Sequence, residues 1–170
     1  MSVPRPVLDE SVRTALDGIA HPLSIASAMR DRGGELTDFR LEFVNLAAAA
    51  WTGQPRSAIV GRKVGELLPA LHRQGLFDEL RTVVETGRPF RQAGVRFVDA
   101  VIDGRNVGGR FDLGALRLGD GYLSVWQDIG DGDSASDELD LSLRRAHALI
   151  PLIRLEAVGL PVLRRSRPAT

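Results

Sequence analysis

The chain has 170 residues, and 44% of them are hydrophobic, which is enough for one packed domain with extensions and too much for a disordered chain. Its 22 basic and 22 acidic residues cancel, so no overall charge favours nucleic acid or an acidic membrane surface. The complete lack of cysteine excludes disulfides, thiolate metal sites and cysteine nucleophiles.

The first segment predicts a loose start and then a short amphipathic helix. Residues 1–7 contain two prolines and favour no regular element. From Asp9, which can cap a helix, apolar residues recur at spacings of three and four until Pro22 closes the pattern. The stripe consists of Leu8, Val12, Ala15, Leu16 and Ile19.

A hairpin and a second helix follow. Residues 23–29 predict a short strand, and RDRGGE is a turn. Residues 36–44 alternate between apolar and polar, which predicts a half-buried strand with Phe39, Leu41 and Phe43 on one face. Asn45 is expected to cap an alanine-rich helix that ends at Gly53.

The rest of the domain predicts one long helical segment and then strands. Residues 63–86 have a helical pattern that Pro69 interrupts, so the main helix is expected from about Leu71. DGRNVGG reads as a loop and GDG as a hairpin turn. The strands expected here are residues 90–101, 109–118 and 122–128. We therefore expect an α+β fold, with a five-stranded antiparallel sheet, helices on one face, and amphipathic helices at both ends.

The C-terminal part predicts a linker, a helix and a tail. GDGDSASDE is a polar linker that lacks the ligand spacing of a calcium loop. Residues 137–150 predict an amphipathic helix that Pro151 ends, and RRSRPAT predicts a disordered basic tail. A short coiled-coil seam would consist of Leu139, Leu143, Ala146, Ile150 and Ile153.

Several motifs in this order resemble the PAS domain family over residues 9–130. They are ALDGIAHPLSI, FVNLAAAAWTG, IVGRKVGELLP, VVETGRPF and GYLSVWQDIG. The resemblance implies a sensory module of a bacterial regulatory protein, without catalytic or metal-binding residues. It divides the chain into an N-terminal helix at 1–20, a sensory domain at 21–130, and a linker, helix and tail at 131–170.

The resemblance also implies a ligand pocket and flanking helices that form a homodimer or transmit a signal to an output domain or partner protein. The pocket candidates are Phe43, Trp51, Leu76, Leu80, Phe111, Ser124 and Trp126. The dimer-interface candidates are Leu8, Val12, Leu16, Leu139, Leu143 and Ile150. Many family members end in Asp-Ile-Thr, and here Asp128, Ile129 and Gly130 occupy the signal-transmission position, so a hydroxyl cap is replaced by a flexible glycine.

No cofactor is assigned from the sequence. Photoactive flavin and thioester chromophores need a cysteine, which the chain lacks. In haem-binding members the axial histidine would fall on Leu76, and His72 lies about one helical turn earlier. Non-covalent flavin stays open, because Trp51 and Trp126 can either flank a flat ring or fill the core. We favour filling, since an indole takes up the space that a ligand would need.

Two alternatives remain beside a ligand sensor. One is a cofactor-free, PAS-shaped dimerisation or interaction domain. The other is a small enzyme of the ketosteroid-isomerase type that would use Asp112 and Tyr122, although in that fold helices precede the first hairpin. The chain shows no apolar start of signal-peptide length and no run near ~18 apolar residues, so we expect a cytoplasmic protein that binds neither membrane nor nucleic acid.

Overall fold

A five-stranded antiparallel sheet forms the centre of the computed structural model, which describes residues 4–132 and 136–157. The strand order is β3-β2-β8-β7-β4, so the last of these five strands along the chain, β8, lies in the middle. The strands are β2 (Leu23–Arg30), β3 (Leu36–Val44), β4 (Phe90–Phe97), β7 (Gly109–Arg117) and β8 (Gly121–Asp128). The predicted α+β fold with a five-stranded antiparallel sheet is confirmed.

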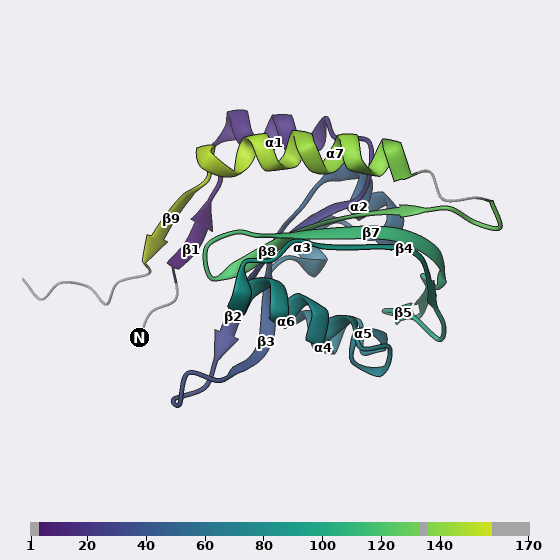
Figure 1. The fold of residues 1–170 in the computed structure, drawn as a ribbon, viewed down its shortest axis with the longest axis horizontal. Helices are drawn as coiled ribbons and strands as arrows, with labels where there is room; N and C mark the ends of the chain where they lie inside the picture. Colours follow the sequence, from purple (N-terminus) through teal and green to yellow (C-terminus); the bar gives the residue numbers. More distant parts are fainter. Residues whose placement is uncertain (1–3, 133–135, 158–170) are drawn as a thin grey trace, which may run out of the picture.

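Helices cover both faces of this sheet (Figure 1). Five short helices lie on one face: α2 (Leu46–Thr52), α3 (Arg56–Ile59), α4 (Val64–Leu67), α5 (Ala70–Arg73) and α6 (Leu76–Thr86). The two amphipathic end helices, α1 (Glu10–Asp17) and α7 (Ser136–Leu149), lie side by side on the other. We call the apolar cluster around Phe39, Phe77 and Tyr122 the inner core, and that around Leu16, Leu123 and Leu139 the outer core.

The buried amide of Asn45 joins these layers. Its Oδ1 accepts hydrogen bonds from the backbone N–H groups of Leu23 (3.0 Å) and Ala48 (2.9 Å). Its Nδ2 donates to the carbonyl oxygens of Leu16 (3.2 Å) and His21 (3.0 Å). The predicted cap of α2 is therefore confirmed, and the same side chain also fixes the end of α1 and the start of β2.

An extra residue in β3 overturns the expectation that Phe43 shares a face with Phe39 and Leu41. Ile25 pairs with Phe43, but the next residue of β2, Ala26, pairs with Leu41, so Glu42 is the additional residue of a β-bulge. Because side chains alternate along a strand, the bulge turns Phe43 to the outer core. Phe39 and Leu41 remain in the inner core.

Two further predictions were wrong in detail. The main helix begins at Leu76 rather than Leu71, because Gly75 adopts a left-handed conformation (φ 76°) that separates α5 from α6. The DGRNVGG segment is not a plain loop. It supplies the turn and second strand, β6 (Arg105–Asn106), of a small hairpin whose first strand is β5 (Val101–Ile102). The turn residues Asp103 and Gly104 both have positive φ. The strand expected over residues 90–101 ends at Phe97 as β4.

The two ends of the described chain pair with each other, which the sequence did not predict. β1 (Pro4–Val7) and β9 (Arg154–Ala157) form a two-stranded antiparallel ribbon. Arg5 on β1 donates two hydrogen bonds to Glu42, of 2.9 and 2.7 Å, which attach the ribbon to β3. The predicted loose start at residues 4–7 is therefore wrong, because pairing with β9 satisfies its backbone.

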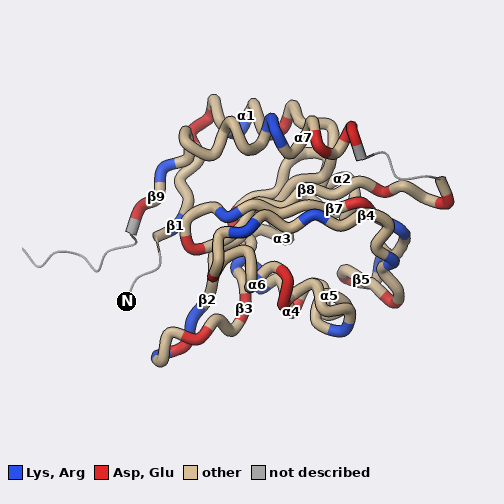
Figure 2. The backbone as a smooth tube through the Cα atoms, viewed as in Figure 1, with Lys and Arg blue, Asp and Glu red and all other residues tan. Residues whose placement is uncertain are grey.

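The C-terminal helix ends as predicted and folds back onto the sheet. α7 stops at Leu149, and the 3₁₀ turn η1 (Ile150–Leu152) follows at Pro151. The middle of the predicted linker, residues 133–135, and the predicted basic tail lie outside the described residues. Acidic and basic residues are interspersed along the described backbone (Figure 2), and none of its helices is both long and apolar enough to cross a bilayer.

We predict that Gly114→Ala loosens α7. A Cβ at position 114 would lie 2.6 Å from Cδ1 of Leu143 on α7, so this side chain must move. Overpacking of this kind costs about 1–3 kcal/mol of unfolding free energy. Hydrogen exchange of the α7 amides and chemical denaturation measure the effect.

The double variant Gly114→Ala/Leu143→Ala should remove the clash and cost less than the sum of the two single changes. Gly33→Ala is the matched control, since its Cβ meets only the Asp31 carboxylate at 3.4 Å. Unchanged exchange of α7 in Gly114→Ala would contradict the close contact between β7 and this helix.

Candidate functional site

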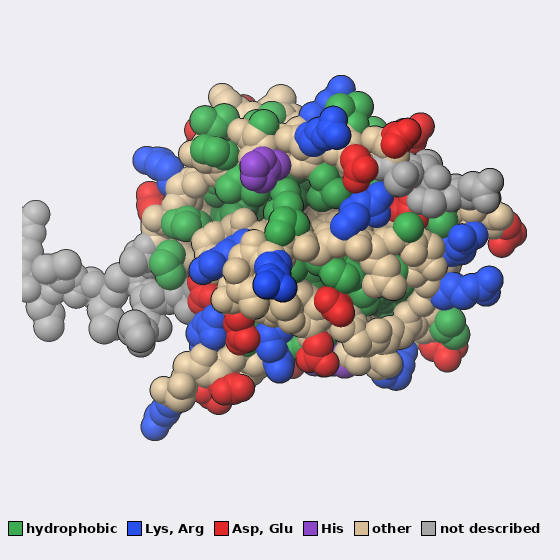
Figure 3. Space-filling model, in the orientation of Figure 1, with side chains coloured by type: hydrophobic (Ala, Val, Ile, Leu, Met, Phe, Trp, Pro, Cys, Tyr) green, Lys and Arg blue, Asp and Glu red, His purple; other side chains and the backbone are tan. Residues whose placement is uncertain are grey.

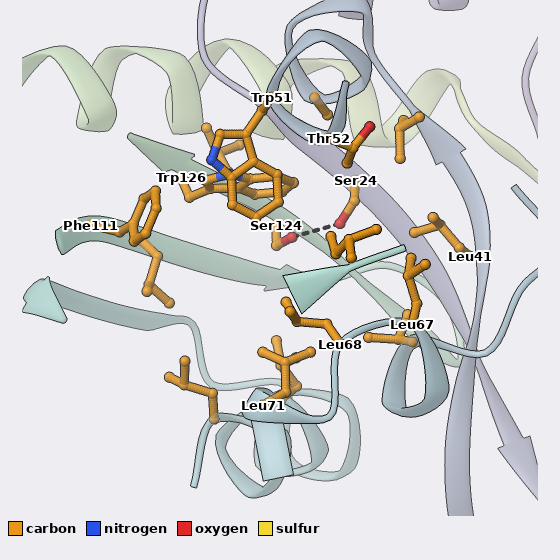
Figure 4. A pocket seen from close by; sticks show the side chains of 18 of the residues that line it. Ser24, Leu41, Trp51, Thr52, Leu67, Leu68, Leu71, Phe111, Ser124 and Trp126 are labelled. Atoms are coloured by element: carbon orange, nitrogen blue, oxygen red, sulfur yellow. Dashed lines mark hydrogen bonds between the residues drawn. The ribbon is translucent and has the colours of Figure 1, made fainter. Parts of the chain in front are cut away.

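A cavity of about 140 Å³ lies between the sheet and helices α2 to α6 (Figure 4). Strands β3, β7 and β8 contribute Leu41, Phe111 and Trp126 to its wall. Helix α4 and the turn after it contribute Leu67 and Leu68. The cavity is apolar because each of these elements turns its hydrophobic side toward the inner core.

Few polar groups line this cavity. The hydroxyl oxygens of Ser24 and Ser124, opposite each other on β2 and β8, lie 2.7 Å apart and form a hydrogen bond. The Thr52 hydroxyl donates to the Ala49 carbonyl of its own helix at 2.8 Å. No charged side chain lines the cavity in the part of the chain that the structure describes. The site therefore offers hydrogen bonds but no counter-charge.

Two tryptophans form one end of the cavity. The rings of Trp51 and Trp126 meet edge to face, with centroids 5.2 Å apart, and Phe111 packs on Trp51 at 5.8 Å. The Nε1 of Trp126 is buried and has no hydrogen-bond partner among the described residues. An unpaired buried donor costs about 1–3 kcal/mol, which ring contacts of about 0.5–1.5 kcal/mol each partly offset.

Of the predicted pocket residues, all except Phe43 line the cavity. They are Trp51, Leu76, Leu80, Phe111, Ser124 and Trp126. Phe43 lies in the outer core because of the bulge at Glu42, with the guanidinium groups of Arg13 and Arg56 near its ring. Sequence reasoning missed Ser24, because the pattern of residues 23–29 does not show which face each side chain takes.

The hairpin of β5 and β6 also supplies Ile102 to the cavity wall. Its tip is held by Asp103, which accepts hydrogen bonds from Arg62 (2.6 and 3.0 Å) and from Gln54 (2.8 Å). The bond from Arg62, and then that from Gln54, lower the pKa of Asp103 from 3.8 to about 2. The Asp-Gly pair was the signal in the sequence for this turn.

Strand β8 connects the cavity to the end helices. Tyr122, Ser124 and Trp126 line the cavity, whereas Leu123 is a fully buried member of the outer core. Val125 also belongs to the outer core and borders the cavity as well. The transmission candidates follow directly. The Gly130 N–H donates to Oδ1 of Asp128 at 2.9 Å, and Gly130 has φ 56°, a conformation that other residues rarely adopt. The glycine thus forms a defined turn.

The dimer-interface candidates are covered by the chain itself. Leu8, Val12, Leu16 and Leu139 are buried in the outer core, and Leu143 and Ile150 pack against it. These side chains fill the space between α1, α7 and the sheet. An interface that used them would first have to open this layer.

The residues considered for haem or enzyme chemistry do not form a site. His72 is exposed, stacks on Phe77 with centroids 4.0 Å apart, and does not line the cavity. Asp112 on β7 lies opposite Gln127, whereas Tyr122 on β8 lies opposite Arg117. Asp112 and Tyr122 are therefore far apart along these paired strands. Burial, and then the charge of Asp38, raise the pKa of Tyr122, which keeps its hydroxyl protonated.

Among the described residues, no group of three His, Cys, Asp or Glu side chains is arranged to hold a metal ion.

Comparison with known proteins assigns the family. The family model described as the PAS fold matches residues 37–129, which is more than half of the chain. The chain belongs to the PAS-fold family. No curated protein sequence matches significantly.

Solved structures of similar fold include a blue-light activated histidine kinase of Erythrobacter litoralis, with a TM-score of 0.59 and 17% identity over 87% of this chain. The match covers 46% of the kinase chain, so this PAS chain spans less than half of its length. The LOV protein of Rhodobacter sphaeroides is similar with a TM-score of 0.54 and 14% identity, covering 85% of this chain and 96% of that one. Both comparisons concern the fold alone.

The cavity of this PAS domain does not fit a flavin or a haem. An apolar cavity of about 150 Å³ takes up benzene, so 140 Å³ is too small for a three-ring isoalloxazine or a porphyrin. Among residues 4–132 and 136–157, no charged side chain lines the wall to hold a phosphate or a propionate, and no histidine lines it. Trp51 and Trp126 are partly buried and pack against the inner core.

We predict that Trp126→Ala lowers the free energy of unfolding by about 3–5 kcal/mol, because its indole packs on Trp51 and the inner core. Chemical denaturation measures the loss. Leu141→Ala is the control, since Leu141 is 48% exposed and its truncation should change stability by less than ~0.5 kcal/mol. Equal stability of Trp126→Ala and the native chain would reject a packing role for the indole.

We also predict that the β5–β6 hairpin loosens in acid. The lowered pKa of Asp103 means that its ionised form is favoured in the fold, so this contribution is complete above pH 4 and is lost as the pH falls through about 2. NMR titration of the carboxyl group should give a midpoint near 2.

Asp103→Asn keeps the turn, since asparagine tolerates positive φ, and should increase exchange of the Val107 amide at neutral pH. An ordinary midpoint near 3.8 would show that Arg62 and Gln54 do not hold the carboxylate in solution.

Proposed function

We propose that this chain is a PAS-type sensory and signal-transduction module that binds a small ligand or a protein partner and relays the change through its end helices. The observation that carries the proposal is that β8 lines the cavity with one face and packs against the end-helix layer with the other. A shift of β8 would change the surface on which α7 rests, because neighbouring side chains of a strand point to opposite faces.

Polar contacts support a relay between β8 and α7. Gln127 donates from Nε2 to Glu138 on α7 at 3.2 Å. A second contact to α7 comes from His21, just before β2, whose Nδ1 lies 2.6 Å from the Ser142 hydroxyl. Leu139, on the same helix, is fully buried, and these contacts would move together with α7. In this proposal, residues 1–20 and 131–170 are the transmitting segments and residues 21–130 the sensory domain.

The output is proposed to lie in another domain or a partner protein of a cytoplasmic, bacterial regulatory system. The similar kinase of Erythrobacter litoralis is blue-light activated, and we do not extend this light response to a chain without cysteine and with a cavity too small for flavin. PAS domains generally sense rather than catalyse, and we propose the same here.

The second candidate is a cofactor-free PAS-shaped interaction domain that forms a homodimer. Hydrophobic side chains gather where α7 and β9 meet the rest of the domain (Figure 3), and Leu141, Leu152 and Leu155 are each about half exposed. Sedimentation equilibrium tests this candidate. A dimer that persists in Leu152→Asp/Leu155→Asp would rule out this surface as its interface.

We predict that a change on the cavity side of β8 reaches α7. Trp126→Phe should alter hydrogen exchange of the α7 amides several-fold, because β8 lines the cavity with one face and packs beneath α7 with the other. The matched control is Leu67→Val, which also trims the cavity wall but lies on α4, away from β8. Equal effects of the two variants on α7, after correction for overall stability, would contradict a relay through β8.

A further inference from the structure

The serine pair in the cavity has one hydroxyl proton to spare. Ser24 and Ser124 lie opposite each other on adjacent strands, and their oxygens are 2.7 Å apart. Each hydroxyl has one proton to donate, and a single bond between them uses only one of the two. Within the described part of the chain, neither hydroxyl makes another hydrogen bond. One donor therefore remains available at the cavity wall.

Thr52 and Tyr122 carry the other hydroxyls among the residues of the wall, and that of Thr52 is already committed. Thr52 donates to the Ala49 carbonyl and accepts from the Gln54 backbone N–H at 3.3 Å. Figure 4 shows the two serine hydroxyls meeting between the strands, with Thr52 nearby and leucine side chains from the helices on the far side. The serine pair thus offers a hydrogen bond to a polar atom of a ligand, in addition to the Tyr122 hydroxyl, whereas the Nε1 of Trp126 is itself buried.

Size and charge limit the rest of the ligand. A volume of about 140 Å³ is close to the ~150 Å³ that accommodates benzene, so one ring with a short substituent is the upper limit without rearrangement. Burying an ionised group here would be unfavourable, because the wall supplies no counter-charge. The aromatic side chains of Trp51, Phe111 and Trp126 favour a flat, apolar body.

We infer that the cavity binds a neutral compound of single-ring size whose one acceptor oxygen takes the free proton of the Ser24–Ser124 pair. This inference rests on the proposed sensory function, since it names the ligand class of the same cavity. If the serine pair only joined β2 to β8, the ligand would not need an acceptor oxygen. Comparing ligands with and without this oxygen separates the two cases.

Three probes of nearly the same shape test the inference. Acetophenone has a carbonyl oxygen, α-methylstyrene replaces it with a methylene group, and benzoate carries a charge. Calorimetric titration should show acetophenone binding about five- to tenfold more tightly than α-methylstyrene, the ratio expected for one net hydrogen bond. Benzoate should bind at least about tenfold more weakly than acetophenone.

The variant Ser24→Ala/Ser124→Ala removes both hydroxyls with little change in volume, and should bring the ratio of the two neutral probes to about one. Thr52→Val is the matched control, because its hydroxyl is already used, and it should keep the ratio of the native chain. Should the double serine variant not fold, the carbonyl ¹³C resonance of labelled acetophenone bound to the native chain gives the answer. It moves downfield only if the oxygen accepts a hydrogen bond.

Equal affinity for acetophenone and α-methylstyrene, tighter binding of benzoate, or no binding of either neutral probe would overturn the inference. The outcome differs from failure of the sensory proposal. If acetophenone binds through the serine pair while exchange of the α7 amides stays unchanged, the ligand class stands and the relay fails. If no probe binds while Trp126→Phe still alters α7, the relay stands and the ligand class fails.

Discussion

The strict alternation of side chains along β8 is the constraint on which the rest of this structure depends. β8 lies at the centre of the sheet, and its side chains point alternately to the two faces. Tyr122 packs edge to face on Phe39 in the inner core, at 4.9 Å, while the adjacent Leu123 is fully buried beneath the end helices. Neighbouring residues of one strand thus line the cavity on one side and support the end-helix layer on the other.

Asn45 gives this arrangement a fixed corner. Because its single amide serves the end of α1, the start of β2 and the cap of α2, both helix layers are anchored at the same edge of the sheet. All of these hydrogen bonds are buried, where an unpaired group would be costly. α7 is held to the sheet by side-chain packing and by polar contacts, such as those between His21 and Ser142 and between Arg91 and Asp140.

Much of the fold could be predicted because it follows from local rules. Alternation gave β3 and β8, Asn45 marked the start of α2, and Pro151 marked the end of α7. The errors arise where one extra residue moves a side chain to the other face of a strand, or where segments distant in the sequence pair with each other. The bulge at Glu42 shifts Phe43 to the other face, and no local signal in residues 36–44 reveals it. Pairing of β1 with β9 joins residues about 150 positions apart, which periodicity cannot detect. For the same reason, the large side chains of the cavity were found from the family motifs, whereas Ser24, whose role depends on its partner across the sheet, was not.

The ribbon of β1 and β9 has a topological consequence. Since Pro4 is paired with Ala157, the chain enters and leaves this domain at one point, and the two strands run in opposite directions there. A fold closed in this way can be inserted into a surface loop of another protein without stretching that loop. Because β1 and β9 are hydrogen-bonded to each other, a displacement of one connection would also displace the other.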